Sequence, residues 1–88
     1  MKVIAFANLQ FVKKILRMQK QVFLEKMGQH IKELRAKKNL SQTDIAHACG
    51  KDPQSLERVE NGKTNPSIYY LFEISKALKI PLRELIDF

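Results

Sequence analysis

Residues 40–63 read LSQTDIAHACGKDPQSLERVENGK, and this stretch decides the fold. Ser41 is a natural N-cap, and Asp44, three residues later, nearly completes a capping box, so a helix is expected to begin here. Gly50 can take the left-handed conformation that ends a helix without steric cost. Asp52 and the proline after it then start a second helix, because aspartate caps free amides and proline has no amide to lose in the first turn. The stretch therefore predicts two short helices separated by a turn of three residues.

The sequence on either side of this stretch supplies three more helices. The first covers residues 28–39 and ends at Asn39. The second covers residues 68–79 and begins after an N-cap at Ser67. The third is short and follows Pro81, within residues 81–88. The positions predicted to face the core are Ile31, Leu34, Ile45, Ala46, Cys49, Ile68, Leu71, Phe72, Ser75, Leu78, Leu82, Leu85 and Ile86. We therefore predict an all-α domain of five helices with no strand.

Length, cysteine content and charge limit the class of protein. The chain has 88 residues, one cysteine and a net charge of +7. A chain of this length forms one small domain, and a single cysteine excludes an internal disulfide, so we expect a reducing, cytoplasmic setting. No apolar run approaches the ~18 residues that a membrane helix needs, and the first residues lack the pattern of a signal peptide. Residues 1–26 carry +5 and residues 27–88 only +2, so a nucleic-acid partner has to be argued from particular residues.

Two short helices joined by a tight, glycine-containing turn are the local signature of a helix-turn-helix. The residues that strengthen this signature are Leu40, Ser41, Gln42, Ile45, Ala46, Gly50, Leu56, Arg58, Val59, Glu60, Asn61, Gly62 and Lys63, followed by Asn65, Pro66 and the tail LFEISKALKIPLREL. With this pattern, residues 27–88 resemble the lambda-repressor-like, or XRE-type, helix-turn-helix family. The resemblance implies a five-helix, lambda-repressor-like DNA-binding domain that acts as a homodimer.

The third helix, expected over residues 53–61, has an apolar side and a polar side. A helical wheel places Leu56, Val59 and Glu60 towards the bundle, and Gln54, Ser55, Glu57 and Arg58 on or beside the outward face. In the major groove glutamine can pair bidentately with adenine and arginine with guanine, so Gln54 and Arg58 are the expected base readers. Ser55 could reach a base or a phosphate, and Glu57 could accept from a cytosine amino group. The resemblance implies the same four positions.

Contacts with phosphates set the register of such a helix in the groove. The resemblance assigns one of these contacts to Gln42, at the start of the second helix. Asn61 and Lys63, just after the third helix, are placed to hold phosphates of the other strand. Two residues depart from the family pattern. Pro53 occupies a site that often holds a base-reading residue, and Lys51 replaces a frequent apolar residue, so either the turn packs less tightly or Lys51 points to the phosphates.

Glu60 needs a partner, because it points towards the bundle, where an unpaired carboxylate would be costly. In the family that the chain resembles, an arginine at the position of Arg35 forms a salt bridge with this glutamate. We therefore expect Arg35 to pair with Glu60 and to tie the first helix to the third.

The remaining chemically reactive side chains favour structural roles. Cys49 is interpreted as a small buried apolar residue, because no base is placed to activate it. His30 and His47 could be imagined as a metal pair, but two solvent-exposed histidines are the simpler interpretation. Of Tyr69 and Tyr70, one is expected at the rim of the core and one at the surface, with a phosphate contact as the alternative. We expect no metal, no cofactor and no enzymatic activity, since the sequence shows no catalytic pair or phosphate-binding loop.

Residues 1–26 have no counterpart in the resemblance, and we treat them as an amino-terminal extension. Their pattern fits a helix that has an apolar stripe on one side and basic residues on the rest of its surface. The stripe consists of Phe6, Leu9, Val12, Ile15, Leu16, Val22 and Phe23. Three interpretations compete: a helix that packs on the domain or on a second subunit, a basic arm that follows DNA, or upstream sequence with Met18 or Met27 as the working start. If the extension is genuine, we expect the stripe to be buried.

Together these features predict a transcriptional regulator of bacterial or phage type that binds double-stranded DNA, in the cytoplasm at the nucleoid. The third helix would read the major groove, and two copies would occupy a palindromic operator. An antitoxin that also binds a toxin partner, or a restriction-modification controller, would look nearly identical over residues 27–88. From another class, a protein-interaction adaptor that no longer reads DNA is the alternative.

Overall fold

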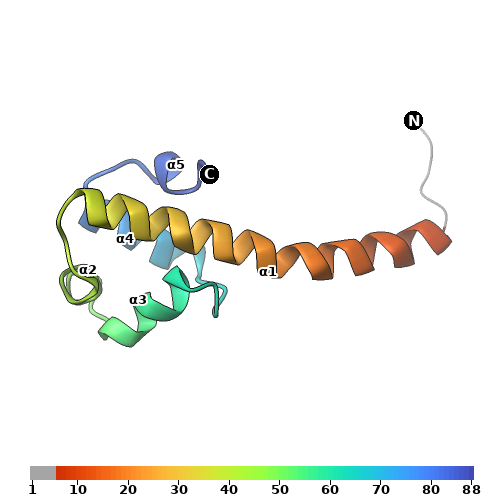
Figure 1. Cartoon of the computed structure of the whole chain (residues 1–88), viewed down its shortest axis with the longest axis horizontal. Helices are drawn as coiled ribbons and strands as arrows, with labels where there is room; N and C mark the ends of the chain where they lie inside the picture. Colours follow the sequence, from red (N-terminus) through yellow and green to blue (C-terminus); the bar gives the residue numbers. More distant parts are fainter. Residues whose placement is uncertain (1–5) are drawn as a thin grey trace.

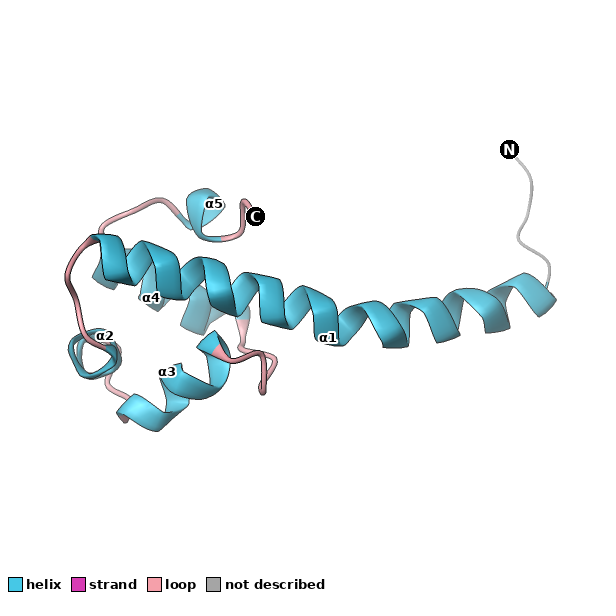
Figure 2. Ribbon diagram, in the orientation of Figure 1, coloured by secondary structure: helices cyan, strands magenta, loops and turns pink. Residues whose placement is uncertain are grey.

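The computed structural model describes residues 6–88, with side chains from residue 8 onward. Its helices are α1 (Phe6–Lys37), α2 (Gln42–Ala48), α3 (Pro53–Glu60), α4 (Ile68–Leu78) and α5 (Leu82–Leu85), and the described residues contain no strand. Helices α2 to α5 gather around the carboxyl-terminal half of α1, while its amino-terminal half projects away from them (Figure 1). Figure 2 shows the loops that join the helices. The predicted all-α fold of five helices is confirmed.

Capping residues fix where α2 and α3 begin. The Oγ atom of Ser41 accepts a hydrogen bond from the Asp44 amide at 2.9 Å, and the Asp44 carboxylate accepts one from the Ser41 amide at 2.9 Å. These bonds complete the capping box, and the one from the Ser41 amide is the main cause that lowers the pKa of Asp44 below its ordinary value. Asp52 caps α3 by accepting from the Ser55 amide at 3.0 Å, directly before Pro53. Both predicted helix starts are confirmed.

Residues with a positive φ lie where α1, α2 and α3 end. Asn39 follows α1 with a φ of 56°, Gly50 follows α2 with 68°, and Gly62 follows α3 with 69°. All three ends agree with the sequence prediction. Gly62 is restricted in a second way, because a Cβ atom there would lie 2.7 Å from the Cγ atom of Glu25. Helix α1 therefore passes close to the end of α3.

The extension and the first predicted helix form one continuous helix of 32 residues. No break occurs near Met27. Leu24 and Met27 are both buried in the core, and the Nε2 atom of Gln21 donates to the carbonyl of Gly62 at 3.1 Å. Contacts between the extension and the domain thus reach back to Gln21. The part of α1 before that residue projects away from the other helices (Figure 1).

Most of the apolar stripe of the extension is exposed in the single chain, so its own domain does not provide the predicted burial. Burial against a second subunit, the other form of this interpretation, stays a prediction. The exposed members of the stripe include Leu9, Val12, Leu16, Val22 and Phe23, joined by Phe11 and Met18, which the sequence analysis did not include. Phe6 belonged to the predicted stripe, but its side chain lies outside the described residues. The reason is geometric: α1 extends beyond the domain. Among these side chains Phe23 contacts the domain, through the ring of Phe88, but it stays exposed.

One core lies between α1 and the other four helices. It consists of Leu24, Met27, Ile31, Ile45, Ala46, Cys49, Leu56, Val59, Tyr70, Leu71, Ile74, Leu78 and Leu85. Burial raises the pKa of the Cys49 thiol, with smaller effects from nearby charges. The predicted burial of Cys49 is confirmed. Within the described chain, no helix combines the length and the apolar character that crossing a bilayer requires.

Three residues predicted to be in the core are exposed instead. Ile68 is the first residue of α4 and Ile86 follows α5, so both lie at helix ends beside solvent. Phe72 sits at the rim, where its ring packs against that of Tyr69 with a centroid separation of 5.8 Å. Tyr70 enters the core in their place. A buried tyrosine needs a partner for its hydroxyl, and Ser55 supplies one at 2.9 Å.

Candidate nucleic-acid interface

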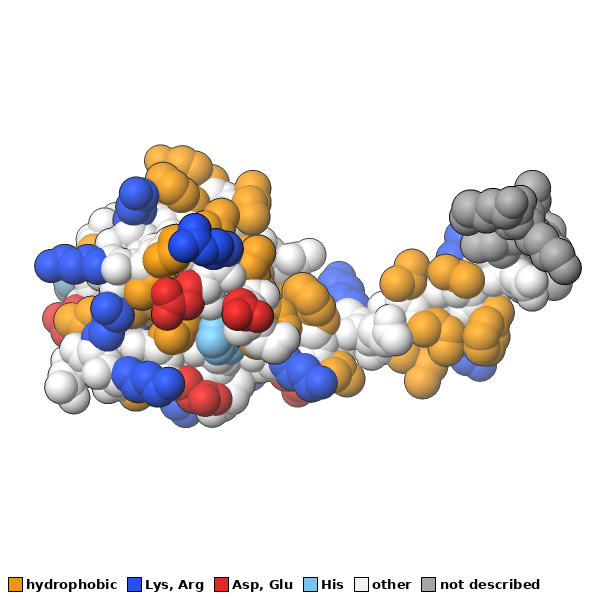
Figure 3. Space-filling model, turned by 90° about the horizontal axis from the view of Figure 1, so that it is seen from above, with side chains coloured by type: hydrophobic (Ala, Val, Ile, Leu, Met, Phe, Trp, Pro, Cys, Tyr) orange, Lys and Arg blue, Asp and Glu red, His pale blue; other side chains and the backbone are white. Residues whose placement is uncertain are grey.

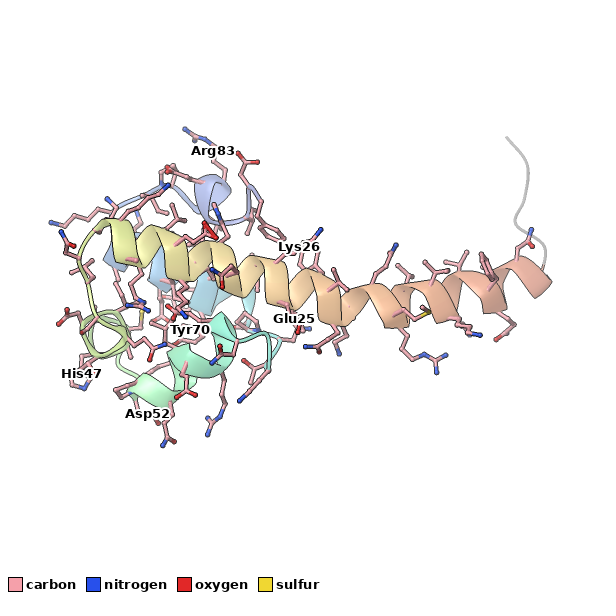
Figure 4. All side chains as sticks on the ribbon, viewed as in Figure 1. Glu25, Lys26, His47, Asp52, Tyr70 and Arg83 are labelled. Atoms are coloured by element: carbon pink, nitrogen blue, oxygen red, sulfur yellow. The ribbon has the colours of Figure 1, made fainter. Side chains whose placement is uncertain are left out.

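Helix α3 presents one side to the core and the other to solvent. Leu56, Val59 and Glu60 are at most 3% exposed. Gln54, Glu57 and Arg58 are exposed, as the wheel predicted. Figure 4 shows Asp52 at the outer end of α3, on the side of the domain away from α5. The polar side of α3 is therefore the surface that an extended partner can reach.

Four polar side chains meet on this surface. Gln54, Glu57 and Arg58 from α3, together with Lys63 from the following loop, line a shallow hollow of about 460 Å³. The set contains an amide, a carboxylate, a guanidinium and an ammonium group, so it can both donate and accept hydrogen bonds. Asn61 is also exposed, at the C-cap of α3. Four of the eight residues predicted to contact DNA thus line one hollow, and a fifth, Asn61, is exposed at the end of the same helix.

Ser55 and Lys51 are oriented differently from these residues, because both contact Tyr70. The Ser55 hydroxyl donates to the Tyr70 hydroxyl at 2.9 Å. The Nζ atom of Lys51 lies 5.0 Å from the centroid of the Tyr70 ring, within range of a cation–π interaction. Burial raises the pKa of Tyr70. The structure thus gives Ser55 a bond to α4 that the wheel did not predict, and it places Lys51 over a ring.

A cluster around Glu60 holds the first three helices together. Arg35 donates to the Glu60 carboxylate from Nε at 2.7 Å and from Nη2 at 3.0 Å, and from Nη1 to the carbonyl of Leu40 at 2.8 Å. The Glu60 side chain is only 1% exposed. The geometry is the bidentate one that gives arginine–carboxylate pairs their strength. The structure contains the ion pair that the resemblance implied.

Gln42 also belongs to this cluster. Its Nε2 atom donates to Oε1 of Glu60 at 2.8 Å, whereas the family resemblance implied a phosphate contact for Gln42. An amide nitrogen carries two hydrogens, so one N–H can bind Glu60 while the other is directed elsewhere. The described side chains include no buried polar atom without a hydrogen bond, so the Glu60 cluster is fully satisfied.

Sequence reasoning missed two residues through which α1 contacts other helices. Gly28, treated as a helix start, lies inside α1, where an added Cβ atom would lie 2.3 Å from the carbonyl oxygen of Val59 and 2.5 Å from that of Glu60. Its lack of a side chain lets α1 and α3 approach closely. His30 was interpreted as solvent-exposed, but it is partly buried and its Nε2 atom lies 2.8 Å from the carbonyl oxygen of Glu84. It therefore joins α1 to α5.

The arrangement of α2 and α3 defines the class of protein. Two short helices are joined by a turn of four residues, 49–52, with a left-handed glycine, where the sequence predicted three. The second helix carries an exposed polar side above a bundle of α1, α4 and α5. This is a helix-turn-helix domain. The helix-turn-helix family model matches residues 31–85 of the chain. The chain therefore belongs to the XRE-type helix-turn-helix family.

Relatives of known sequence cover most of the same region. The transcriptional regulator SinR of Bacillus subtilis is 36% identical over 62 residues, which are 69% of this chain and 56% of SinR. The control protein C.BamHI of Bacillus amyloliquefaciens is 34% identical over 62 residues, 69% of this chain and 76% of that protein. The chain thus spans just over half the length of SinR.

A solved structure has the same fold. The crystal structure of the restriction-modification controller protein C.AhdI from Aeromonas hydrophila matches with a TM-score of 0.72 and 38% sequence identity. The match covers 74% of this chain and 94% of the C.AhdI chain. The part of this chain outside the match is about the size of its projecting amino-terminal segment.

Proposed function

We propose that the protein is a transcriptional regulator that binds double-stranded DNA in a sequence-specific way, with α3 in the major groove. The observation that carries the proposal is the exposed polar side of α3, where Gln54, Glu57 and Arg58 stand together on a helix whose other side is locked into the core. Helix α3 has the width that the major groove admits. Family membership and the relatives named as regulators support this function.

In this proposal Gln54 and Arg58 form hydrogen bonds with particular bases. Glu57 disfavours every base at its position except cytosine. A carboxylate beside the phosphates is repelled unless it accepts a hydrogen bond from a base, and cytosine offers an amino group for this purpose. Ser55 stays part of the proposed set. Its hydroxyl would reach a base once the hydrogen bond from Ser55 to the Tyr70 hydroxyl is broken. The proposed phosphate contacts are those of Asn61, Lys63, Lys51 and the second N–H of Gln42.

The base-reading assignment predicts that Gln54→Ala combined with Arg58→Ala removes sequence preference. Each bidentate base contact contributes about 1–3 kcal/mol of discrimination, so the double variant should lose roughly 30-fold to about 25,000-fold in preference for its site. Selection of bound fragments from genomic DNA measures this, with wild type and variant side by side.

A matched control replaces the same residue types elsewhere. Gln29→Ala combined with Arg83→Ala alters an exposed glutamine and an exposed arginine away from α3 and should enrich the same motif as wild type. The base-reading assignment fails if the Gln54 and Arg58 variant selects the wild-type motif with equal strength. The proposed function itself fails if wild type enriches no motif.

Lys63→Ala should weaken binding to every DNA sequence by a similar factor. The logarithm of the affinity falls with the logarithm of the salt concentration with a slope of about −0.9 per phosphate contacted, so the variant should show a slope shallower by about one. A salt titration with the selected site and with an unrelated duplex checks this. Lys79→Ala, an exposed lysine at the end of α4, serves as the control and should leave the slope unchanged. An unchanged slope for Lys63→Ala would remove this residue from the phosphate contacts.

The second candidate is a narrower role within the same function, the control of a restriction-modification operon. The match that favours it is C.AhdI, because 94% of that chain is covered at 38% identity. A selected motif that lies upstream of restriction and modification genes would support this role, and a motif found only elsewhere would exclude it. An antitoxin would be distinguished from both of these regulators by a toxin that co-purifies with it. Such a toxin is expected to bind outside the polar side of α3.

A further inference from the structure

The projecting half of α1 carries apolar side chains that helices α2 to α5 leave uncovered, and four of them, which differ in part from the stripe predicted from the sequence, are called the stripe from here on. Phe11, Ile15, Met18 and Val22 follow one another at intervals of four, three and four residues. This is the spacing of core positions in a two-helix coiled coil. Phe11 and Met18 are 64% and 63% exposed, and Val22 is 50% exposed. Figure 3, seen from the side opposite α3, shows apolar side chains on the projecting segment.

We infer that this stripe binds the same stripe of a second copy, with the two α1 helices antiparallel. The spacing is self-complementary. In an antiparallel pair centred between Ile15 and Met18, each Ile15 faces the partner's Met18 and each Phe11 faces the partner's Val22. A two-fold symmetric interface requires this reciprocity, because the same surface must match itself. The flanking Lys14 faces the partner's Gln19, so no like charges meet beside the stripe.

The surface also contains a hollow that can accommodate Phe11, the largest side chain of the stripe. Met18, Gln19, Val22, Phe23, Lys26 and Phe88 line an apolar hollow of about 570 Å³. Phe23 and Phe88 form its wall as an edge-to-face pair with ring centroids 5.2 Å apart. The antiparallel register brings the partner's Phe11 opposite Val22, at this hollow. A knob of one helix thus meets a hole on the other, as in coiled coils.

The area is sufficient for a stable pair. Phe23 and Phe88 are 56% and 44% exposed, whereas Ile15 is partly buried. With side chains of ordinary size, the stripe and the hollow expose roughly 500 Å² of surface per chain, or about 1,000 Å² in a pair, which is about the least that a biological interface should bury. The stems of Lys14 and Lys26 add to this area. An uncovered apolar patch of this size is at the upper end for a monomeric protein.

The pairing also predicts the distance between the two α3 helices, and this step rests on the proposed function. Gly28, which contacts the end of α3, lies 11.5 residues from the centre of the pair, or about 17 Å at 1.5 Å per residue. The two α3 contacts are therefore about 35 Å apart along the pair, and half-sites one turn of DNA apart are separated by 34–36 Å.

The orientation of α3 fits the same arrangement. On α1, Gly28 lies roughly 110° around the helix from the centre of the stripe. The two-fold axis of an antiparallel pair is perpendicular to the plane that contains both helices. It therefore leaves the two Gly28 residues on the same side of that plane, and both α3 helices lie on that side. Arg17 lies eleven residues before Gly28, close to three turns, and therefore on that side too. A positive charge between the two reading helices suits a DNA backbone.

Sedimentation equilibrium without DNA tests the pairing. Wild type is expected to be a dimer at micromolar concentration, and Ile15→Glu combined with Met18→Glu should weaken dimerisation by about 100-fold or more, because the pair would bury carboxylates. Both positions lie outside the domain core, and circular dichroism verifies that the domain stays folded. Ile68→Glu combined with Phe72→Glu makes the same chemical change on exposed residues of α4 and should leave the dimer intact.

Cysteine cross-linking tests the register. A chain with Phe11→Cys and Val22→Cys should form a covalent dimer on oxidation, whereas neither single variant should, because position 11 meets position 22 only in an antiparallel pair. Cross-linking of either single variant with itself indicates parallel helices and overturns the inference. So does a monomeric wild type, a tetramer, or a dimer that Ile15→Glu and Met18→Glu leave unchanged. None of these measurements involves DNA, so a failure here is distinct from a failure to select a DNA motif.

Discussion

Replacing Arg35 with alanine is expected to destabilise the domain by about 3–5 kcal/mol, because the substitution leaves a buried carboxylate without its cation. Glu60 is 3% exposed, and its carboxylate would keep only the single bond from Gln42. The free energy of unfolding from urea titration, followed by circular dichroism, measures the loss.

Two further variants make this result interpretable. Arg83→Ala removes an exposed arginine from α5 and should cost less than about 0.5 kcal/mol. Arg35→Met combined with Glu60→Leu should recover most of the loss, since replacing a whole buried pair by apolar residues is often neutral. A loss below about 0.5 kcal/mol for Arg35→Ala would mean that the pair behaves as a surface salt bridge in solution.

Gly28→Ala is expected to be strongly destabilising, although the same change inside an exposed helix normally stabilises by about 1 kcal/mol. The new Cβ atom would lie 2.3 Å from the Val59 carbonyl oxygen and 2.5 Å from that of Glu60. Backbone atoms cannot rotate away, so α3 must move off α1, and overpacking of this kind costs about 3 kcal/mol. The urea midpoint measures the loss, and binding to the selected DNA should weaken as α3 is displaced.

Gly50→Ala is the comparison for this result. At Gly50 a Cβ atom would meet nothing within 4 Å, but the φ of 68° is unfavourable for alanine. The expected loss is therefore only the strain of a left-handed residue, about 1–2 kcal/mol. If Gly28→Ala is as stable as wild type or more stable, the close approach of α1 and α3 does not exist in solution.

The sequence was sufficient for features that depend on neighbouring residues. The starts of α2 and α3 follow from Ser41 and Asp52, because a cap acts within three residues. The buried and exposed sides of α3 follow from the helical period alone. The pairing of Arg35 with Glu60 spans 25 positions, and it could be expected only through the resemblance to a family.

Features that depend on distant contacts could not be predicted in this way. Nothing near Gly28 in the sequence indicates that the backbone of α3 lies against it, so the glycine was taken as a helix start. The hydrogen bond between Ser55 and Tyr70 likewise requires the position of α4. The continuous α1 was missed because a single glycine was given more weight than its cost of about 1 kcal/mol justifies.

Helix α3 is held in place from its buried side only, and this has a consequence for how such proteins diversify. Leu56, Val59 and Glu60 anchor it, while Gln54, Glu57 and Arg58 face solvent. Substitutions at exposed positions usually change stability by less than about 0.5 kcal/mol. If the proposed function holds, a duplicated gene could therefore acquire a new operator by changing these three side chains, because each intermediate sequence would still fold.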